Sequence, residues 1–203
     1  MVDHPLVHDA LMELRDVETG TSAFRRAASR ISVLLAAEAL RSLPTVVTSV
    51  KTPLGPAEGR VVRCDVVVVP VLRAGLSMVD AVLQLIPSAR VGHIGLQRDE
   101  TTAVASRYYS KFPPEIGGSH VLMVDPMLAT GGSAVAAVDL VKAAGASRIV
   151  LVCVISAPEG VDLLQARHPD VDIYTPVVDR ELNAHKFIVP GLGDFGDRLY
   201  GTT

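Results

Sequence analysis

The sequence has little sulfur and few aromatic residues: two cysteines, no tryptophan and 4% aromatics among 203 residues. Cys64 and Cys153 lie in separate valine-rich runs, without a CxxC pair or a nearby histidine. Structural zinc sites need closely spaced cysteines and histidines, so this spacing gives no indication of one. We expect two buried thiols in a reducing compartment rather than a disulfide.

Long apolar stretches and an excess of basic charge are also missing. Although 49% of the residues are apolar, no uninterrupted run approaches the roughly 18 residues that a membrane-spanning helix requires. Residues 1–14 include three acidic side chains, unlike a secretory signal peptide. A formal net charge of −3 argues against broad binding to nucleic acid. We therefore expect a soluble, cytoplasmic protein with neither a membrane nor a nucleic-acid partner, and a single domain over residues 1–203.

Both common nucleotide-binding fingerprints fail. The segment from Gly191 to Gly196 matches GxGxxG, but a dinucleotide site needs a following helix and an acidic residue about 20 positions later. The printed chain ends seven residues after Gly196. The pair Gly131-Gly132 is followed by Ser133 and not by the lysine of a Walker A loop. These failures exclude a redox Rossmann enzyme and a P-loop enzyme.

What the sequence does contain is an alternation of short valine-rich runs with helical segments, repeated four times. This order predicts an α/β fold, a mostly parallel sheet flanked by helices on both faces. Pro70 is expected to mark the end of its strand, because proline cannot donate to a sheet ladder. The predicted strands cover residues 65–72, 90–96, 120–124, 148–156 and 171–175, and the predicted helices between them cover 74–86, 134–144 and 158–168.

Other segments are predicted as appendages of this core. Residues 5–17 and 21–43 have helical spacing, and their apolar stripes can pack on the core or form a subunit contact. The β-branched residues 45–51 and 59–63 flank a turn-forming stretch and predict a hairpin. Residues 99–114 are polar, include two tyrosines and a lysine, and suggest an arm or flap.

The most informative stretch runs from His120 to Gly145. A buried strand ends in Asp125, a loop with paired glycines follows, and a helix begins just after the loop. A helix N-terminus and exposed loop N–H groups attract an anion, while the carboxylate can accept hydrogen bonds from hydroxyls. Taken alone, Asp125 could equally cap a turn, and Thr130 could equally cap the helix.

Two further strand ends favour a binding site over simple capping. Arg73 follows the first predicted strand and precedes Ala-Gly, which would let a ligand approach the backbone, and Arg98 follows the second strand. The carboxyl ends of parallel strands meet at one edge of the sheet, where ligands bind. We expect Arg73, Arg98 and Asp125 to converge there on a polyanion.

The motifs resemble those of one family along nearly the whole chain. Residues 124–133 are similar to the loop that binds 5-phospho-α-D-ribose 1-diphosphate (PRPP) in the uracil phosphoribosyltransferases, including Pro126 where most phosphoribosyltransferases carry a second acidic residue. Residues 72–76 resemble the family's diphosphate loop, and 188–198 resemble its base-binding tail. The resemblance implies a type I-like phosphoribosyltransferase fold with N-terminal helices, a β-arm and a C-terminal base-binding segment.

The resemblance also implies an activity, transfer of ribose 5-phosphate from PRPP to N1 of uracil to give UMP and diphosphate, in pyrimidine salvage. Mg²⁺ would enter with the diphosphate rather than sit in a protein cage, and the implied catalytic residues are Asp194 and Arg73. Residues implied in PRPP binding are Arg73, Arg98, Asp125, Pro126, Met127, Leu128, Ala129, Thr130, Gly131, Gly132, Ser133 and Asp194. Residues implied in uracil binding are Ile188, Gly193, Asp194 and Phe195.

Several questions stay open at this level. A nucleotide-sensing binding protein would need a basic face that neither the net charge nor any Lys/Arg run supports, and Pro126 weakens a purine-type assignment. The N-terminal helices favour a homo-oligomer without choosing between a dimer and a larger assembly. Some relatives respond to GTP, and the sequence leaves open whether this chain does. Phe187 and Phe195 depart from the family pattern, and no role is assigned to Tyr108, Tyr109 or Lys111.

Overall fold

The structure is a computed structural model that describes residues 1–98 and 105–202, without the side chains of residues 97, 98, 105 and 106. Its described part contains a seven-stranded sheet in the order β11-β9-β7-β3-β5-β6, with β4 also paired to β3. Every pairing is parallel except that of β5 with β6, which confirms the predicted mostly parallel α/β fold. The strands are β3 (Val66–Leu72), β4 (Arg90–Val91), β5 (His93–Arg98), β6 (Ala105–Lys111), β7 (His120–Val124), β9 (Arg148–Val152) and β11 (Asp172–Tyr174).

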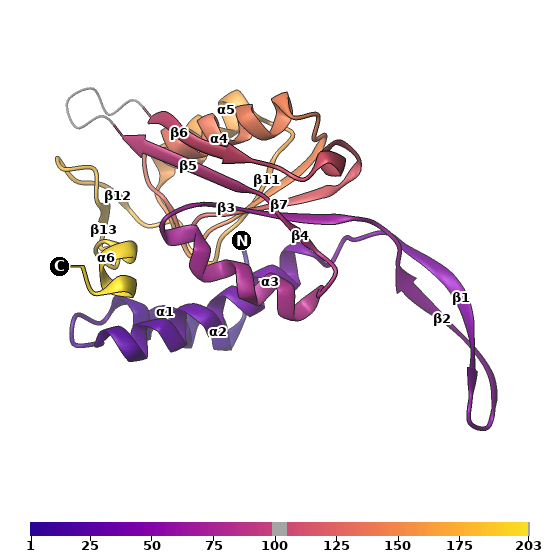
Figure 1. Cartoon of the computed structure of the whole chain (residues 1–203). Helices are drawn as coiled ribbons and strands as arrows, with labels where there is room; N and C mark the ends of the chain where they lie inside the picture. Colours follow the sequence, from indigo (N-terminus) through magenta and orange to yellow (C-terminus); the bar gives the residue numbers. More distant parts are fainter. Residues whose placement is uncertain (99–104, 203) are drawn as a thin grey trace.

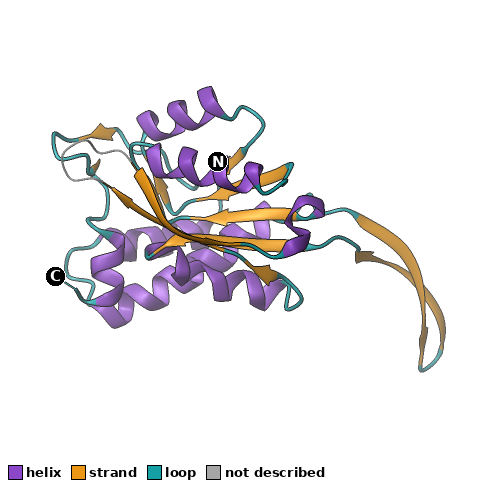
Figure 2. Cartoon of the chain, turned by 45° about the horizontal axis from the view of Figure 1, so that its top comes forward, coloured by secondary structure: helices purple, strands orange, loops and turns teal. Residues whose placement is uncertain are grey.

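Helices cover both faces of this sheet, as Figures 1 and 2 show. One layer contains α1 (Pro5–Arg15), α2 (Thr21–Ala39) and α3 (Val79–Leu85), and the opposite layer contains α4 (Gly132–Ala143) and α5 (Pro158–Arg167). Side chains alternate between the faces of a strand, so each strand serves two cores. In β7, Leu122 and Val124 pack in the core under α1 and α2, whereas Val121 and Met123 pack in the core under α4.

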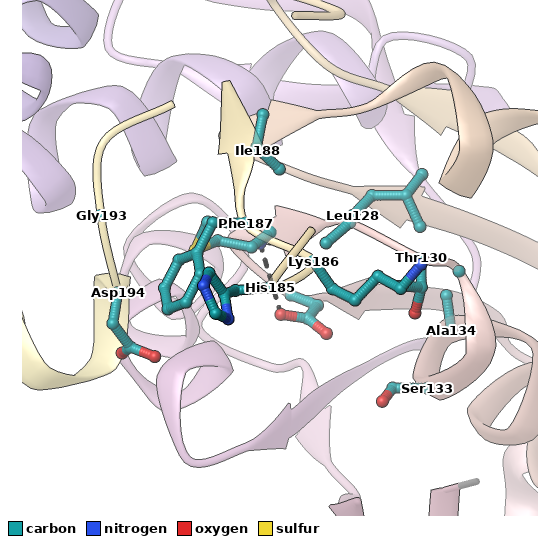
Figure 3. Close-up of a pocket in the computed structure, with 14 residues that line it drawn as sticks. Leu128, Thr130, Ser133, Ala134, His185, Lys186, Phe187, Ile188, Gly193 and Asp194 are labelled. Atoms are coloured by element: carbon teal, nitrogen blue, oxygen red, sulfur yellow. Dashed lines mark hydrogen bonds between the residues drawn. The ribbon is translucent and has the colours of Figure 1, made fainter. Parts of the chain in front are cut away.

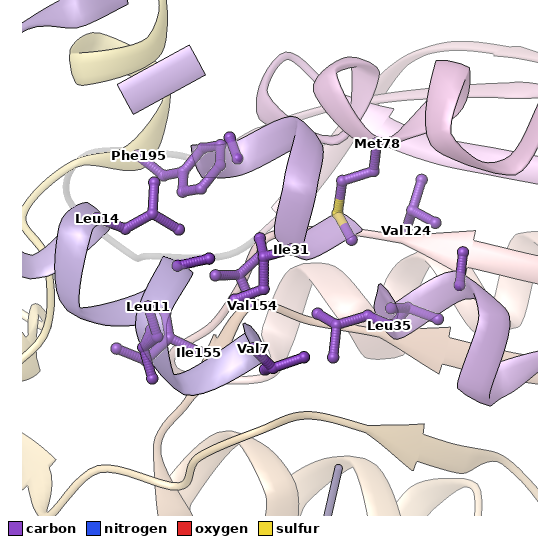
Figure 4. Close-up of a cluster of buried hydrophobic side chains, with 14 of the residues drawn as sticks. Val7, Leu11, Leu14, Ile31, Leu35, Met78, Val124, Val154, Ile155 and Phe195 are labelled. Carbon is purple, nitrogen blue, oxygen red and sulfur yellow. The ribbon is translucent and has the colours of Figure 1, made fainter. Parts of the chain in front are cut away.

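The two N-terminal helices bury their apolar stripes inside their own chain. Val7, Leu14, Phe24, Ile31 and Leu35 are all fully buried in the core shown in Figure 4. The sequence left open whether these stripes pack on the core or form a subunit contact, and the structure places them in the core. They therefore give no support to the homo-oligomer expected from them.

The predicted hairpin is present and extends away from the body (Figure 1). Its strands β1 (Thr45–Thr52) and β2 (Gly55–Val62) pair antiparallel from Thr45↔Val62 to Thr52↔Gly55. Residues 46, 50 and 61 are valines on the same face of this ribbon, because Val46 pairs with Val61 and alternate residues share a face. They are 43%, 56% and 39% exposed, so the hairpin carries an apolar face that residues 1–98 and 105–202 leave largely uncovered.

Pro70 lies inside β3 and does not end it, contrary to expectation. The strand continues to Leu72, with Pro70 paired to Val124 of β7. On the other side of β3 the ladder is interrupted: Val67 and Val68 pair with β4, and pairing resumes with β5 only at Val71. The proline stands in that interruption, which is where a missing N–H donor costs least in a central strand.

Several short elements complete the fold. Two segments that the sequence predicted as continuous are each divided into two elements. The helix expected over 74–86 begins as a 3₁₀ turn, and the strand expected over 148–156 continues after β9 as a separate strand that pairs with the loop after β7. No helix in 1–98 or 105–202 is long and apolar enough to cross a membrane. The short elements are η1 (Ala74–Met78), η2 (Pro114–Gly118), β8 (Met127–Leu128), β10 (Ile155–Ser156), β12 (Glu181–Leu182), β13 (Ile188–Val189) and α6 (Phe195–Tyr200).

Candidate functional site

Two of the predicted strand ends meet with the C-terminal tail around one hollow. Arg73 follows β3, Asp125 follows β7, and Asp194 precedes α6, and all three line a hollow of about 230 Å³. The convergence of Arg73 and Asp125 follows from the parallel pairing of their strands. Arg98 ends β5 in the same sheet, but its side chain lies outside the described part of the structure.

Asp125 is half-buried and holds the start of the loop that follows it. Its Oδ1 accepts a hydrogen bond from the Met127 N–H at 3.4 Å, so the turn-capping role considered from the sequence is real. The next residue, Pro126, accepts at its carbonyl from the N–H groups of Val154 and Ile155, at 2.9 and 3.0 Å. These bonds fix the loop to the strand pair β8–β10 and leave Asp125 facing the hollow.

The loop turns into α4 through Gly131. This residue has φ +80°, and a Cβ there would lie 2.9 Å from the Gly160 carbonyl oxygen, so conformation and space both require glycine. Gly131 is the N-cap of α4, and as a glycine it has no side chain of its own to cap the helix. The first-turn N–H groups of α4 are therefore suited to an anion, with no acidic side chain in that turn.

A second cavity, of about 260 Å³, joins this loop to the C-terminal tail (Figure 3). It shares Asp125, Met127 and Asp194 with the hollow beside Arg73. The two hollows therefore form one continuous site that runs from the arginine to the loop. The lining residues are Asp125, Met127, Leu128, Ala129, Thr130, Gly131, Ser133 and Ala134 from the loop side, and His185, Lys186, Phe187, Ile188, Gly193 and Asp194 from the tail side.

Three predicted site residues lie outside the lining of the 260 Å³ cavity. The Phe195 ring is buried and packs edge-to-face on Phe24, with 5.0 Å between the ring centroids, so only its backbone is available to a base. Pro126 and Gly132 do not line the 260 Å³ cavity. Asp194 does line it, and its Oδ1 accepts from the Asp197 N–H at 2.9 Å as the N-cap of α6.

Arg73 is an exposed cation at the β3 end of the site. Its side chain is 61% exposed, with Nη2 3.4 Å from Asp197 Oδ1, and the Leu72–Arg73 peptide bond is cis. The nearby Gly75 was expected to admit a ligand close to the backbone. A Cβ at Gly75 would instead lie 2.4 Å from the Val124 carbonyl oxygen, so the glycine is required by the packing of the chain on itself.

The chain resembles known proteins over its full length. A profile described as "Uracil phosphoribosyltransferase" matches residues 1–202. The chain belongs to the uracil phosphoribosyltransferase family. The protein of that name from Dictyoglomus thermophilum is 54% identical over 203 residues, covering 100% of this chain and 98% of the relative. The one from Clostridium perfringens (strain 13 / Type A) is 50% identical over 202 residues, covering 99% and 97%.

Solved structures share the fold of this chain. The AQ2163 protein from Aquifex aeolicus superposes with a TM-score of 0.94 at 35% identity, covering 100% of this chain and 97% of that one. An adenine phosphoribosyl transferase from Trypanosoma brucei superposes with a TM-score of 0.58 at 14% identity, covering 88% and 81%. The second match, at 14% identity, shows a shared fold alone. This member of the uracil phosphoribosyltransferase family therefore has the fold of a solved phosphoribosyltransferase.

In this family member, an arginine–carboxylate pair holds the tail in place. Arg15 of α1 contacts both Asp179 carboxylate oxygens, at 2.8 and 2.6 Å, and donates to the Gly191 carbonyl at 2.8 Å. The Gly191 N–H also donates to Asp179, at 2.8 Å. Burial raises the pKa of the Asp179 carboxyl, but the Arg15 and Gly191 hydrogen bonds and the Arg15 charge outweigh it, so the pKa lies below its usual value.

Arg198 forms the second connection between the tail and the N-terminal helices. Its guanidinium donates to the carbonyls of Leu14, Asp16 and Leu192 and stacks over the Phe24 ring at 4.5 Å. The turn between α1 and α2 is therefore attached to the segment that contains Gly193 and Asp194. Neither Arg15 nor Arg198 was identified from the sequence, because Asp179 and Gly191 lie more than a hundred positions from Arg15, as do Leu14 and Asp16 from Arg198.

Both cysteines are free: Cys64 is half-buried, and Cys153 is buried behind the loop, where burial and the Asp125 charge raise the pKa of its thiol. Of the expected arm, residues 99–104 lie outside the described residues, and β6 forms the edge of the sheet. There the Tyr108 ring packs against Gly95 of β5, while Tyr109 is 44% exposed.

Proposed function

We propose that this chain transfers ribose 5-phosphate from PRPP to N1 of uracil, forming UMP and diphosphate, and so acts in pyrimidine salvage. The observation that carries this proposal is the cavity that joins the loop after Asp125 to the tail from His185 to Asp194. A sugar phosphate on the loop would lie next to a base on the tail, as a glycosyl transfer requires. Membership of the uracil phosphoribosyltransferase family supports uracil as that base.

The residues around the site suit the parts of PRPP in order. Asp125 would accept hydrogen bonds from the ribose hydroxyls, and residues 129–133 with the start of α4 would bind the 5-phosphate. Arg73, in the adjoining hollow, would bind the diphosphate, with Arg98 beside it. This order follows the continuity of the two hollows, since Asp125 lines both.

Mg²⁺ is proposed to arrive on the diphosphate. Within the described residues no three His, Cys, Asp or Glu side chains form a metal cluster. The carboxylates of Asp125 and Asp194 line the hollow beside Arg73, and carboxylate oxygens with diphosphate oxygens are ligands that suit Mg²⁺. When bound there, the ion would neutralise charge on the departing diphosphate.

The same residues suit the charges that develop during the reaction. Cleavage of the C1–O bond leaves positive charge on the ribose and negative charge on the diphosphate. Arg73 would stabilise the diphosphate as its charge forms, and the Asp194 carboxylate would offset oxocarbenium character at C1. Because Asp194 Oδ1 caps α6, the position of this carboxylate is fixed before substrate binds.

Uracil recognition is proposed to rest on the backbone of the tail. Uracil presents acceptor, donor and acceptor along O2, N3–H and O4, and the backbone near Ile188 and Gly193–Phe195 can match that order with N–H, C=O and N–H. The Phe195 ring is buried, and Phe187 supplies an exposed aromatic ring to the cavity; with only 4% aromatic residues in the chain, stacking on Phe187 is proposed to be secondary to the backbone hydrogen bonds. Cytosine replaces O4 with an amine, which would face a buried donor and be rejected.

One assay tests the proposal directly. The protein is incubated with PRPP, Mg²⁺ and each nucleobase in turn, and diphosphate and nucleotide are measured. We expect UMP from uracil and at least a hundredfold lower kcat/KM for cytosine, because an unpaired buried donor costs about 1–3 kcal/mol and can give discrimination well beyond a hundredfold. Comparable rates for the two pyrimidines would overturn the backbone readout, and no product with any base would favour a nucleotide-binding protein instead.

We also propose a homo-oligomer in the cytoplasm. The uncovered valine face of the β1–β2 hairpin supports self-association, and the two free cysteines are consistent with a reducing compartment. A GTP effector remains a prediction from the family resemblance. Its test is titration of GTP into the uracil assay at subsaturating PRPP, where activation would appear as a higher rate.

A further inference from the structure

We propose that Lys186 is a ligand of the substrate's 5-phosphate, contributed by the base-binding tail to the loop on the opposite side of the cavity. This inference rests on the proposed function, because it assigns a specific cation to the phosphate of PRPP and UMP. It concerns a residue that neither the motifs nor the strand ends pointed to.

The first observation is the backbone of Lys186. The strands β12 and β13 pair antiparallel, and the turn between them is closed by a hydrogen bond from the Lys186 N–H to the Asn183 carbonyl at 2.9 Å. The Asn183 side chain also accepts from the His185 and Phe187 N–H groups, at 2.9 and 3.0 Å. Lys186 follows with φ +65°, the left-handed position of a short hairpin loop.

That position normally favours glycine or asparagine, because a side chain there is strained. Lys186 is the one non-glycine residue with positive φ in residues 1–98 and 105–202. Nothing in the turn itself needs a lysine, since the closing hydrogen bonds come from the backbone and from Asn183. Strain retained at a cavity wall suggests a functional reason for the side chain.

The second observation is where the side chain points. Lys186 lines the 260 Å³ cavity, and Figure 3 shows its ammonium group beside Thr130, at the end of the loop that precedes α4. Its backbone belongs to the tail, so the side chain spans the cavity from the base side to the phosphate side. A phosphate on the first-turn N–H groups of α4 would lie within reach of this cation.

The third observation is the charge of the cavity wall. Its lining includes two carboxylates, Asp125 and Asp194, whereas Lys186 is the sole lysine or arginine among the described lining residues. The loop from Ala129 to Ser133 has no cationic side chain of its own. A phosphate monoester with between one and two negative charges would therefore depend on Lys186 for a direct ion pair.

This arrangement gives Lys186 a second effect. Ile188 lies two residues further along, in β13, and lines the same cavity. A phosphate that pairs with Lys186 would hold the hairpin, and with it the base-binding strand, against the loop. The uracil site would then be complete only after PRPP has bound. UMP, which has the phosphate, would bind more tightly than uridine, which lacks it.

The test uses Lys186→Gly and Lys186→Asn, since both replacements suit a left-handed residue, with Lys186→Arg as the charge-retaining variant. We expect the first two to raise the KM for PRPP and the Kd for ribose 5-phosphate about tenfold or more, the usual effect of losing a charged hydrogen bond. Their melting temperatures should equal or exceed that of the wild type, because the strain is removed. Lys186→Arg should restore most of the phosphate affinity.

Arg26→Gln is the control, because Arg26 is exposed on α2 and lines neither hollow. It removes one positive charge and should leave both constants unchanged. A purely structural Lys186 would give a stability change in the glycine variant with PRPP and ribose 5-phosphate constants within twofold of wild type, and that result would overturn the inference. Wild-type protein that makes no UMP would instead refute the proposed function, while calorimetry with ribose 5-phosphate would still report on Lys186.

Discussion

Asp125 illustrates how one side chain can serve both the fold and the proposed chemistry. Its Oδ1 receives the Met127 N–H, and the carboxylate lines both hollows of the site. The capping role needs only a carbonyl-like oxygen, whereas binding of ribose hydroxyls benefits from a charged acceptor on both oxygens. The two roles can therefore be separated by a conservative substitution.

We expect Asp125→Asn to lower kcat/KM for PRPP by about 10- to 100-fold, because hydrogen bonds to a charged group contribute roughly 1.5–3 kcal/mol. The free energy of unfolding should change by less than about 1 kcal/mol, since asparagine keeps an oxygen for Met127. Steady-state kinetics and urea titration measure the two effects. The matched control is Asp162→Asn, exposed on α5, and equal kinetics for both variants would remove Asp125 from the site.

At the scale of elements, the sequence predicts the sheet edge but not the tail hairpin. The strand from His120 to Val124 and the hairpin follow from local apolar patterns, and the approach of Arg73 to Asp125 follows from parallel pairing. The tail hairpin with Lys186 was missed because its strands are two residues long and its conformation depends on Asn183. The available signal was the mostly polar run Asn-Ala-His-Lys at 183–186, followed by the apolar pair Phe187-Ile188.

Other misses share a physical reason: they depend on contacts between distant residues. Pro70 is tolerated in a central strand because the facing ladder is interrupted there, and that interruption belongs to residues 90–94. Gly75 is needed because the Val124 carbonyl approaches it. Arg15 reaches Asp179 across the chain. Local periodicity contains none of this information.

The tail connection gives a prediction at the same scale. Arg15→Met should raise the KM for uracil more than that for PRPP, because Arg15 fixes Gly191 and not the phosphate loop. It should destabilise the fold by about 3 kcal/mol, since the buried Asp179 carboxylate would lose its cationic partner and keep only the Gly191 N–H. Arg30→Met, which breaks exposed pairs with Asp9 and Glu13, should cost less than about 1 kcal/mol.

The dependence of this effect on pH has a definite sign. In the wild type the folded-state pKa of Asp179 is lowered, so the pair contributes stability that is complete above the unfolded pKa of about 3.9 and is lost below it. The stability deficit of Arg15→Met should therefore be full at neutral pH and shrink as acid protonates Asp179. Urea titrations across this range measure it, and a deficit that grows in acid would contradict the assignment.

At the scale of the whole molecule, the β1–β2 hairpin is the element whose apolar face packs on no core of the described chain. It extends beyond the body with Val46, Val50 and Val61 on one face. The helices that suggested self-association in the sequence are committed to the core. Any homo-oligomer is therefore expected to be built on the hairpin and not on α1 and α2.

We expect Val50→Lys to weaken self-association by at least about tenfold, because it places a charge in an apolar contact. Ser49→Lys is the matched control, as the adjacent residue points to the opposite face of the same strand. Sedimentation velocity over a range of concentrations compares the two variants with the wild type. Equal dissociation of both variants, or none of either, would exclude this valine face as the contact.

The attachment of the tail to the turn between α1 and α2 has a consequence for how base preference could evolve. Arg198 binds carbonyls of Leu14 and Asp16, and Arg15 binds Gly191, so small shifts of this turn are transmitted to the segment around Gly193. Selection in the laboratory for an altered pyrimidine analogue should therefore recover substitutions at residues 16–19 as well as in the cavity. Such changes would retune selectivity from outside the pocket and leave every group that touches the base intact.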